Sequence, residues 1–239
     1  MMDTYNKIHD LMIRAIEEKR PNEIEEFCLP IWNQPFFYKL DKARVLTISY
    51  SPTDRGAKTN YPSLVEEHKV NPLSSEKIFE VLYDFIPEPH FRGNYNKIFS
   101  ELNVNPSEIA HMDISSFPFN KDGTRQKLRN IDKSYKYTLE AIDLLSDQLE
   151  YILIDGKDNK EIIEKHFSKD YILHNETSMA INKSNRPYKL SIYKHKIKNT
   201  TLIYYGCFLW GNTRPNKEYL QKIVEYIKKS VNWYHEEKV

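Results

Sequence analysis

Residues 45–54 read Val-Leu-Thr-Ile-Ser-Tyr-Ser-Pro-Thr-Asp, a short apolar run that passes directly into a polar Ser-Pro turn. Residues 202–215 repeat this arrangement, with an apolar run followed by the polar loop Gly-Asn-Thr-Arg-Pro. In α/β proteins, ligands and catalytic groups usually lie in the loops beyond the carboxyl ends of such strands. We therefore predict that these two loops, which are far apart in the sequence, face one cleft.

The length and composition of the chain predict one globular domain. Its 239 residues are enough to bury one sizeable core, and we expect a single domain over 1–239 with residues 1–40 as an N-terminal helical cap. No apolar run reaches the roughly 18 residues of a membrane span, and the first residues lack the pattern of a signal peptide. These features predict a cytoplasmic protein with no membrane partner, which we expect to be a monomer.

The two cysteines, Cys28 and Cys207, are far apart and form neither a CxxC pair nor a metal-ligand spacing. They are typical of buried thiols in a reducing compartment. The histidines likewise show no helical ligand spacing. We therefore expect no metal and no cofactor.

The pattern of apolar residues predicts alternating helices and strands. This alternation favours a three-layer α/β/α sandwich with a mostly parallel sheet of four to five strands. The last two strands are predicted to form a hairpin through a turn at Asn199 and Thr200. The predicted helices cover 3–19, 75–85, 95–102, 131–149, 160–167 and 216–233, and the predicted strands cover 45–49, 110–117, 151–154, 171–173, 188–197 and 202–208.

Charge is distributed unevenly, although the net charge is only +1. Residues 177–217 contain no Asp or Glu but carry eight Lys and Arg residues. Such a cationic segment suits a phosphate backbone, and Lys183, Arg186 and Lys217 are the predicted contacts to it. The alternative interpretation is a basic hairpin that is simply solvated.

Several common catalytic signatures are absent, including GxGxxG, the Walker lysine loop, GxSxG and HExxH. Polar residues at the ends of predicted strands remain as the candidate site. They are Tyr50, Ser51, Asp54, Asp113, Asn212 and Arg214.

These segments resemble the active-site motifs of the uracil-DNA glycosylase superfamily. Residues 49–54 are similar to its first motif, a strand followed by a Gly-x-(Asp/Asn)-Pro turn, and residues 110–118 to its middle strand, which ends in a base-reading Asn. Residues 150–157 resemble its strand-Gly-helix unit, and residues 211–215 take the place of its last loop, (His/Asn)-Pro-Ser-Pro. The resemblance implies the fold of that superfamily and hydrolysis of an N-glycosidic bond in DNA after base flipping.

The resemblance also implies catalytic roles for three residues. Ser51 stands where efficient uracil enzymes carry a water-activating Asp, and Asp54 is the nearest carboxylate that could act as the base instead. The alternative for Asp54 is an ordinary turn residue. Asn212 takes the place of the residue that donates to the base carbonyl O2 and stabilises negative charge on the leaving base. The alternative for Asn212 is an ordinary Gly-Asn turn.

Departures from the superfamily pattern point to the base. Thr53 replaces a bulky Tyr that excludes substituents at carbon 5, so modified pyrimidines would fit; the alternative is a backbone shift that closes the gap. Asp113 replaces the base-reading Asn, and an ionised carboxylate can only accept, which suits the cytosine N4 amine. Alternatively, Asp113 is a strand-end residue that binds loop amides or His111.

Three further residues complete the predicted substrate site. The resemblance implies that Tyr61 stacks under the base and that Arg214 contacts a DNA phosphate or the space left by the flipped base. The alternatives are a structural role for Tyr61 and a solvated side chain for Arg214. Tyr50, at the end of the first strand, is a further candidate for substrate binding.

Together, the resemblance and these substitutions imply an enzyme that excises a 5-modified cytosine, such as hydroxymethylcytosine or its glucosylated form, from phage DNA as an antiviral defence. One alternative is a glycosylase for uracil or for mismatched or deaminated bases, in the manner of DNA repair. The other is a catalytically silent module that binds nucleic acid, which the missing Asp at position 51 favours.

Overall fold

A computed structural model of the 239-residue chain gives the fold. It describes residues 7, 10, 11, 14, 43–49, 70, 94–95, 97–105, 108–113, 139–156, 160–180, 187–207 and 215–236. The chain divides into two compact units: 1–43, 50–88 and 110–148 form the first, and 44–49, 89–109 and 149–239 form the second. The predictions of a single domain and of an N-terminal helical cap stay predictions.

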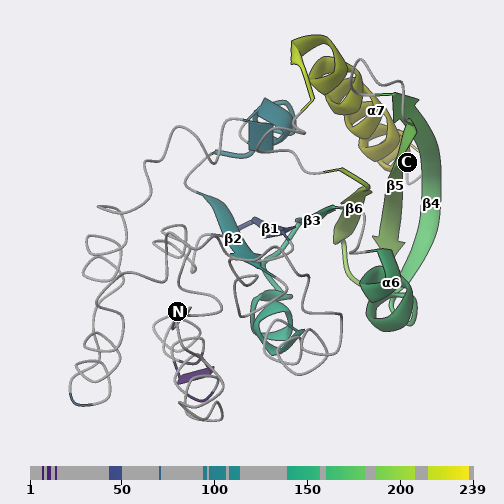
Figure 1. Ribbon diagram of the computed structural model, residues 1–239. Helices are drawn as coiled ribbons and strands as arrows, with labels where there is room; N and C mark the ends of the chain where they lie inside the picture. Colours follow the sequence, from purple (N-terminus) through teal and green to yellow (C-terminus); the bar gives the residue numbers. More distant parts are fainter. Residues whose placement is uncertain are drawn as a thin grey trace, which may run out of the picture. The chain divides into compact units, whose positions relative to one another are not determined.

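The central feature is a six-stranded, mostly parallel open sheet with the order β2-β1-β3-β6-β5-β4 (Figure 1). β1, β3 and β6 are parallel neighbours, whereas β5 and β4 continue the sheet in antiparallel pairs. The predicted mixed α/β class is therefore confirmed, and the predicted count of four to five strands is wrong by at least one. The strands are β1 (Val45–Ser49), β2 (Ile109–Asp113), β3 (Tyr151–Asp155), β4 (Tyr171–Ala180), β5 (Pro187–His195) and β6 (Thr201–Tyr205).

The edge strand β4 is much longer than the sequence pattern predicts. Apolar residues mark only 171–173, but the strand continues to Ala180 and pairs with β5 from Tyr171↔His195 to Ala180↔Pro187. Its described side chains are exposed or half-buried, so no buried apolar alternation identifies its second half. Pairing with β5 therefore defines this strand, and local sequence does not.

The helices of the second unit follow the predicted positions closely. α6 (Lys160–Ile162) continues into a π-helical turn, η6 (Ile163–Phe167). The long helix α7 (Lys217–Glu236) begins after Asn216, whose side-chain oxygen accepts from the amide of Tyr219 at 3.0 Å and caps the helix. Among the residues that the structure describes, no helix is long and apolar enough to cross a membrane.

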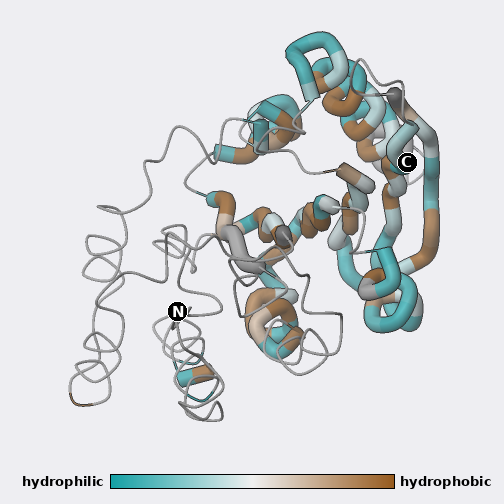
Figure 2. Tube along the Cα trace, viewed as in Figure 1, coloured by the Kyte–Doolittle hydropathy of each residue, from teal (hydrophilic) through white to brown (hydrophobic). Residues whose placement is uncertain are grey.

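The core of the second unit lies between the sheet and α7. Leu220, Ile223, Val224, Ile227 and Val231 are buried at helical spacing along α7. They belong to one apolar cluster with strand residues and with the helical segment at 94–100. In Figure 2, hydrophobic and hydrophilic positions alternate along α7, as an amphipathic helix requires. Burial of each such side chain stabilises the fold by about 2 kcal/mol.

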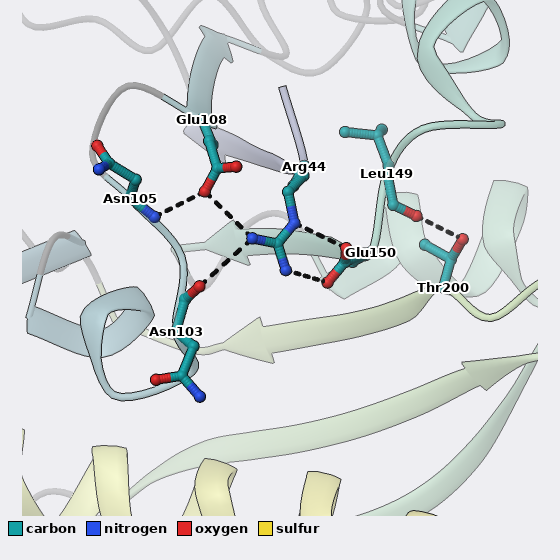
Figure 3. Close-up of polar contacts among 7 residues, drawn as sticks. All are labelled: Arg44, Asn103, Asn105, Glu108, Leu149, Glu150 and Thr200. Carbon is teal, nitrogen blue, oxygen red and sulfur yellow. Dashed lines mark hydrogen bonds and ion pairs between the residues drawn. The ribbon is translucent and has the colours of Figure 1, made fainter. Parts of the chain in front are cut away.

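The amino ends of the strands are joined by Arg44 (Figure 3). Its Nε and Nη2 donate to the two carboxylate oxygens of Glu150 at 2.7 and 2.8 Å, a bidentate pair. Its Nη1 donates to Glu108 Oε2 at 3.1 Å and to the Asn103 carbonyl at 3.3 Å. The hydrogen bonds to Glu150 raise the pKa of Arg44 above its ordinary value, so the guanidinium stays charged.

Backbone hydrogen bonds extend this junction across three strands. The carbonyl of Arg44 accepts from the amides of Glu150 at 2.8 Å and Tyr151 at 3.1 Å, and the Thr201 amide donates to the Glu150 carbonyl at 2.8 Å. The buried Thr200 hydroxyl donates to the Leu149 carbonyl at 2.9 Å (Figure 3). These contacts fix the amino edge of the parallel strands, which leaves their carboxyl edge as the place for a site.

Candidate functional site

Strand order marks the carboxyl edge of β1 and β3 as the candidate site. In the sheet, β2 lies next to β1 on one side, and β3, the next strand along the chain, lies next to β1 on the other side. β1 and β3 are parallel neighbours, in register from Val45↔Tyr151 to Ile48↔Ile154. Ligands of open α/β sheets bind outside the carboxyl ends of strands, at the point where the strand order reverses.

A buried carboxylate closes the carboxyl end of β3. The Asp155 side chain is 0% exposed, and the Tyr95 hydroxyl donates to its Oδ2 at 2.8 Å. Tyr95 belongs to the helical segment at 94–100 and is itself buried. Since a buried carboxylate is costly without hydrogen bonds, this contact stabilises the strand end and fixes the helical segment beside it.

Tyr205 of β6 lies directly opposite Asp155 in the register of the parallel pair. The Tyr205 side chain is fully buried, and its hydroxyl has no hydrogen-bond partner among the described residues. Burial, with smaller contributions from Cys207, Tyr188 and Asp155, raises the pKa of Tyr205 well above its ordinary value. The hydroxyl therefore stays protonated, and its unsatisfied burial costs about 1–3 kcal/mol.

Gly156 ends β3 in a conformation that favours glycine. Its φ is 102°, and its amide donates to the Tyr205 carbonyl at 2.9 Å. The predicted strand followed by glycine and a helix is therefore present, because α6 begins at Lys160 soon after.

The parallel strands place the starts of three connections at one edge. β1 ends at Ser49, β3 at Asp155 and β6 at Tyr205, and the parallel pairing directs all three ends the same way. The next residues after β1 are those of the predicted Ser-Pro turn, and the chain after β6 continues toward the predicted Gly-Asn loop. The two predicted loops thus begin on either side of β3, at the same edge of the sheet.

Two of the predicted site residues fall on described elements. Asp113 is the last residue of β2, where the structure describes the strand but not this side chain. Lys217 is the first residue of α7 and is exposed. The remaining predicted site residues lie outside the described part of the chain: Tyr50, Ser51, Thr53, Asp54, Tyr61, Lys183, Arg186, Asn212 and Arg214.

Three lysines of the acid-free segment 177–217 form hydrogen bonds or ion pairs with other residues of the chain. Lys189 pairs with Glu176 at 2.7 Å, just outside the segment, and this hydrogen bond lowers the pKa of Glu176. Lys194 donates to the Thr201 hydroxyl at 2.7 Å, and Lys196 donates to the Lys169 carbonyl. Lys194 thus joins β5 to β6, whereas Lys189 joins β5 to β4 and Lys196 contacts the turn before β4.

Sequence reasoning did not single out Tyr95, Asp155 or Tyr205. Asp155 has a sequence signal, because it directly follows a four-residue apolar run before a glycine. Tyr95 has none, since its partner lies 60 residues away. Among the described residues, no group of three or more His, Cys, Asp and Glu is placed to hold a metal ion.

Comparisons with known proteins add no assignment to this geometry. No known protein family matches the chain, and no curated protein matches it.

Proposed function

We propose that this protein is a DNA glycosylase with a three-layer fold like that of the uracil-DNA glycosylase superfamily. The observation that carries the proposal is the parallel arrangement of β1, β3 and β6. Because these strands are parallel, the loops that follow β1 and β6 begin at the same edge of the sheet, on either side of β3. These two loops contain the first and last motifs that resemble the superfamily, at residues 49–54 and 211–215. This edge is the one at which α/β proteins bind ligands.

In the proposed reaction, water replaces the base at the sugar carbon. Positive charge develops on the sugar and negative charge on the departing base. Asn212 donates to the base carbonyl O2 and stabilises the negative charge. Asp54 activates the water and Ser51 positions it.

The proposed substrate is a flipped cytosine with a substituent at carbon 5, as in hydroxymethylcytosine and its glucosylated form. Asp113 accepts from the N4 amine, and Thr53 leaves room beside carbon 5. Tyr61 stacks under the base, Tyr50 lines the cleft and Arg214 contacts the DNA. Phage genomes contain such bases, so the proposed role is antiviral defence by a cytoplasmic monomer.

An abasic-site assay tests the proposal. The purified protein is offered labelled DNA with uracil, thymine opposite guanine, hydroxymethylcytosine or glucosyl-hydroxymethylcytosine, and strand breaks are measured after alkali. We expect breaks at a modified cytosine that Asn212→Ala abolishes. Asn199→Ala is the matched control, because Asn199 is exposed in the turn between β5 and β6 at the amino edge.

Other outcomes of this assay assign the protein differently. Release of plain uracil, unchanged by Asp113→Asn, would indicate a repair-type glycosylase and reject the cytosine assignment. DNA binding that falls steeply with salt, without release of any base, would reject catalysis and indicate a binding module.

A further inference from the structure

A groove of about 400 Å³ runs between α7 and the helical segment at 94–100, within the second unit. Its apolar lining is provided by Leu220 and Val224, which are both 4% exposed. The helical segment and the residue after it contribute Lys97, Ser100 and Glu101, and α7 contributes Lys217, Glu218 and Gln221.

Two lysines of this groove carry uncompensated charge. The acids of the groove are each paired with a lysine of α7: Glu101 with Lys228 at 3.1 Å, and Glu218 with Lys222 at 2.7 Å. Lys97 and Lys217 are exposed, and their ammonium groups have no acidic partner among the described residues. The groove therefore presents two cations from two different helices, above an apolar floor.

The helical segment that carries Lys97 also lies against the candidate site. Tyr95 reaches Asp155 at the carboxyl end of β3 through the 2.8 Å hydrogen bond. Lys97 follows Tyr95 by two residues on the same segment. The groove and the candidate site therefore share this helical segment.

We propose that this groove binds the phosphodiester backbone of the nucleic acid, with Lys97 and Lys217 on neighbouring phosphates. This inference rests on the proposed function for the identity of the ligand. Lysine suits the task because its ammonium binds phosphate as a point charge on a flexible stem. The sequence pattern singled out Lys217 but not Lys97, because Lys97 lies outside the acid-free segment.

Binding of the full chain to labelled DNA that contains no modified base tests the inference, with anisotropy measured across a salt series. We expect the variant with both Lys97→Gln and Lys217→Gln to bind roughly 3- to 10-fold more weakly at low salt. The slope of log K against log salt should become shallower by about 2, one unit for each lost phosphate contact. The Lys97→Arg and Lys217→Arg pair should retain binding.

Lys169→Gln is the matched control. Lys169 is exposed and lies directly before the start of β4. The part of β4 that lies near α7 is its other end, where Met179 lines a groove with Tyr219 of α7. The control should keep the wild-type slope. The inference is overturned if wild type does not bind DNA, if the double variant keeps the wild-type slope, or if Lys169→Gln loses as much. Equal binding of poly-glutamate, lost in the double variant, would also overturn it and assign the groove to an acidic peptide.

The two proposals fail separately. Salt-dependent binding that needs both lysines, without release of any base, keeps the groove as a nucleic-acid contact and rejects the glycosylase. Base release with an unchanged slope in the double variant keeps the glycosylase and rejects the groove.

Discussion

The Tyr95 hydroxyl donates a 2.8 Å hydrogen bond to the carboxylate of Asp155, at the carboxyl end of β3. Both residues are almost completely removed from solvent, at 2% and 0% exposure. The contact joins the helical segment at 94–100 to the central parallel strand. The stability of the second unit and the shape of its carboxyl edge therefore depend on the same pair.

Tyr95→Phe removes this donor and leaves the buried carboxylate with one hydrogen bond fewer. We expect the free energy of unfolding to fall by about 1.5–3 kcal/mol, the range for hydrogen bonds to charged groups, as measured by urea denaturation at pH 7. The control is Tyr219→Phe, in a half-buried tyrosine of α7, which should change stability by less than about 0.5 kcal/mol. Equal losses in the two variants would show that the hydrogen bond contributes nothing.

Tyr205→Phe should stabilise the protein, whereas Tyr95→Phe should destabilise it. It removes a buried hydroxyl that has no hydrogen-bond partner among the described residues. We expect the free energy of unfolding to rise by about 1 kcal/mol, because the cost of burying the hydroxyl disappears. The same urea denaturation experiment checks it, and a loss of stability like that of Tyr95→Phe would contradict it.

Arg44→Lys tests the junction at the amino edge. A lysine keeps the charge but cannot form the bidentate pair with Glu150 while also reaching Glu108. We expect the free energy of unfolding to fall by about 1–2 kcal/mol. Arg14→Lys is the matched control, because the Arg14–Glu140 pair is exposed and should contribute less than about 0.5 kcal/mol. If Arg14→Lys lowers the free energy of unfolding as much as Arg44→Lys does, the junction around Arg44 contributes no more than an exposed ion pair.

His195 predicts a pH dependence of stability. Its Nδ1 accepts from the amides of Ile197 at 3.1 Å and Lys198 at 2.8 Å, which requires the neutral ring. Burial lowers the pKa of His195, and Asp170 only partly opposes this. Because the unfolded chain then takes up the proton at higher pH than the folded one, stability falls as pH drops below about 6.5.

The comparison with His195→Gln isolates this effect, since glutamine keeps a side-chain acceptor but does not titrate. Urea denaturation at pH 7.5 and pH 5 should show wild type losing more stability than the variant over this interval. A difference between the two proteins that does not change with pH would show that His195 titrates alike in both states.

The local pattern of the sequence was sufficient for the elements that bury one apolar stripe or a continuous apolar run. The predicted strand at 151–154 is β3, and the predicted helix at 216–233 is α7 with its end extended to Glu236. β4 was underestimated because an edge strand with exposed and half-buried side chains has no such pattern. Cys207 is buried, as predicted from cysteine usage.

The sequence by itself determined where most strands and helices lie, with the second half of β4 as the exception, and which strand ends lead into polar loops, because burial period and turn chemistry act within a few residues. Only the tertiary structure decided the strand order, and with it the reversal between β2 and β3 around β1. It also decided that Tyr95 lies against Asp155 and that Tyr205 lies opposite it. The members of these pairs are 50 or 60 positions apart in the sequence. A pattern within a few residues cannot predict such a contact, because the packing of the whole sheet brings the two residues together.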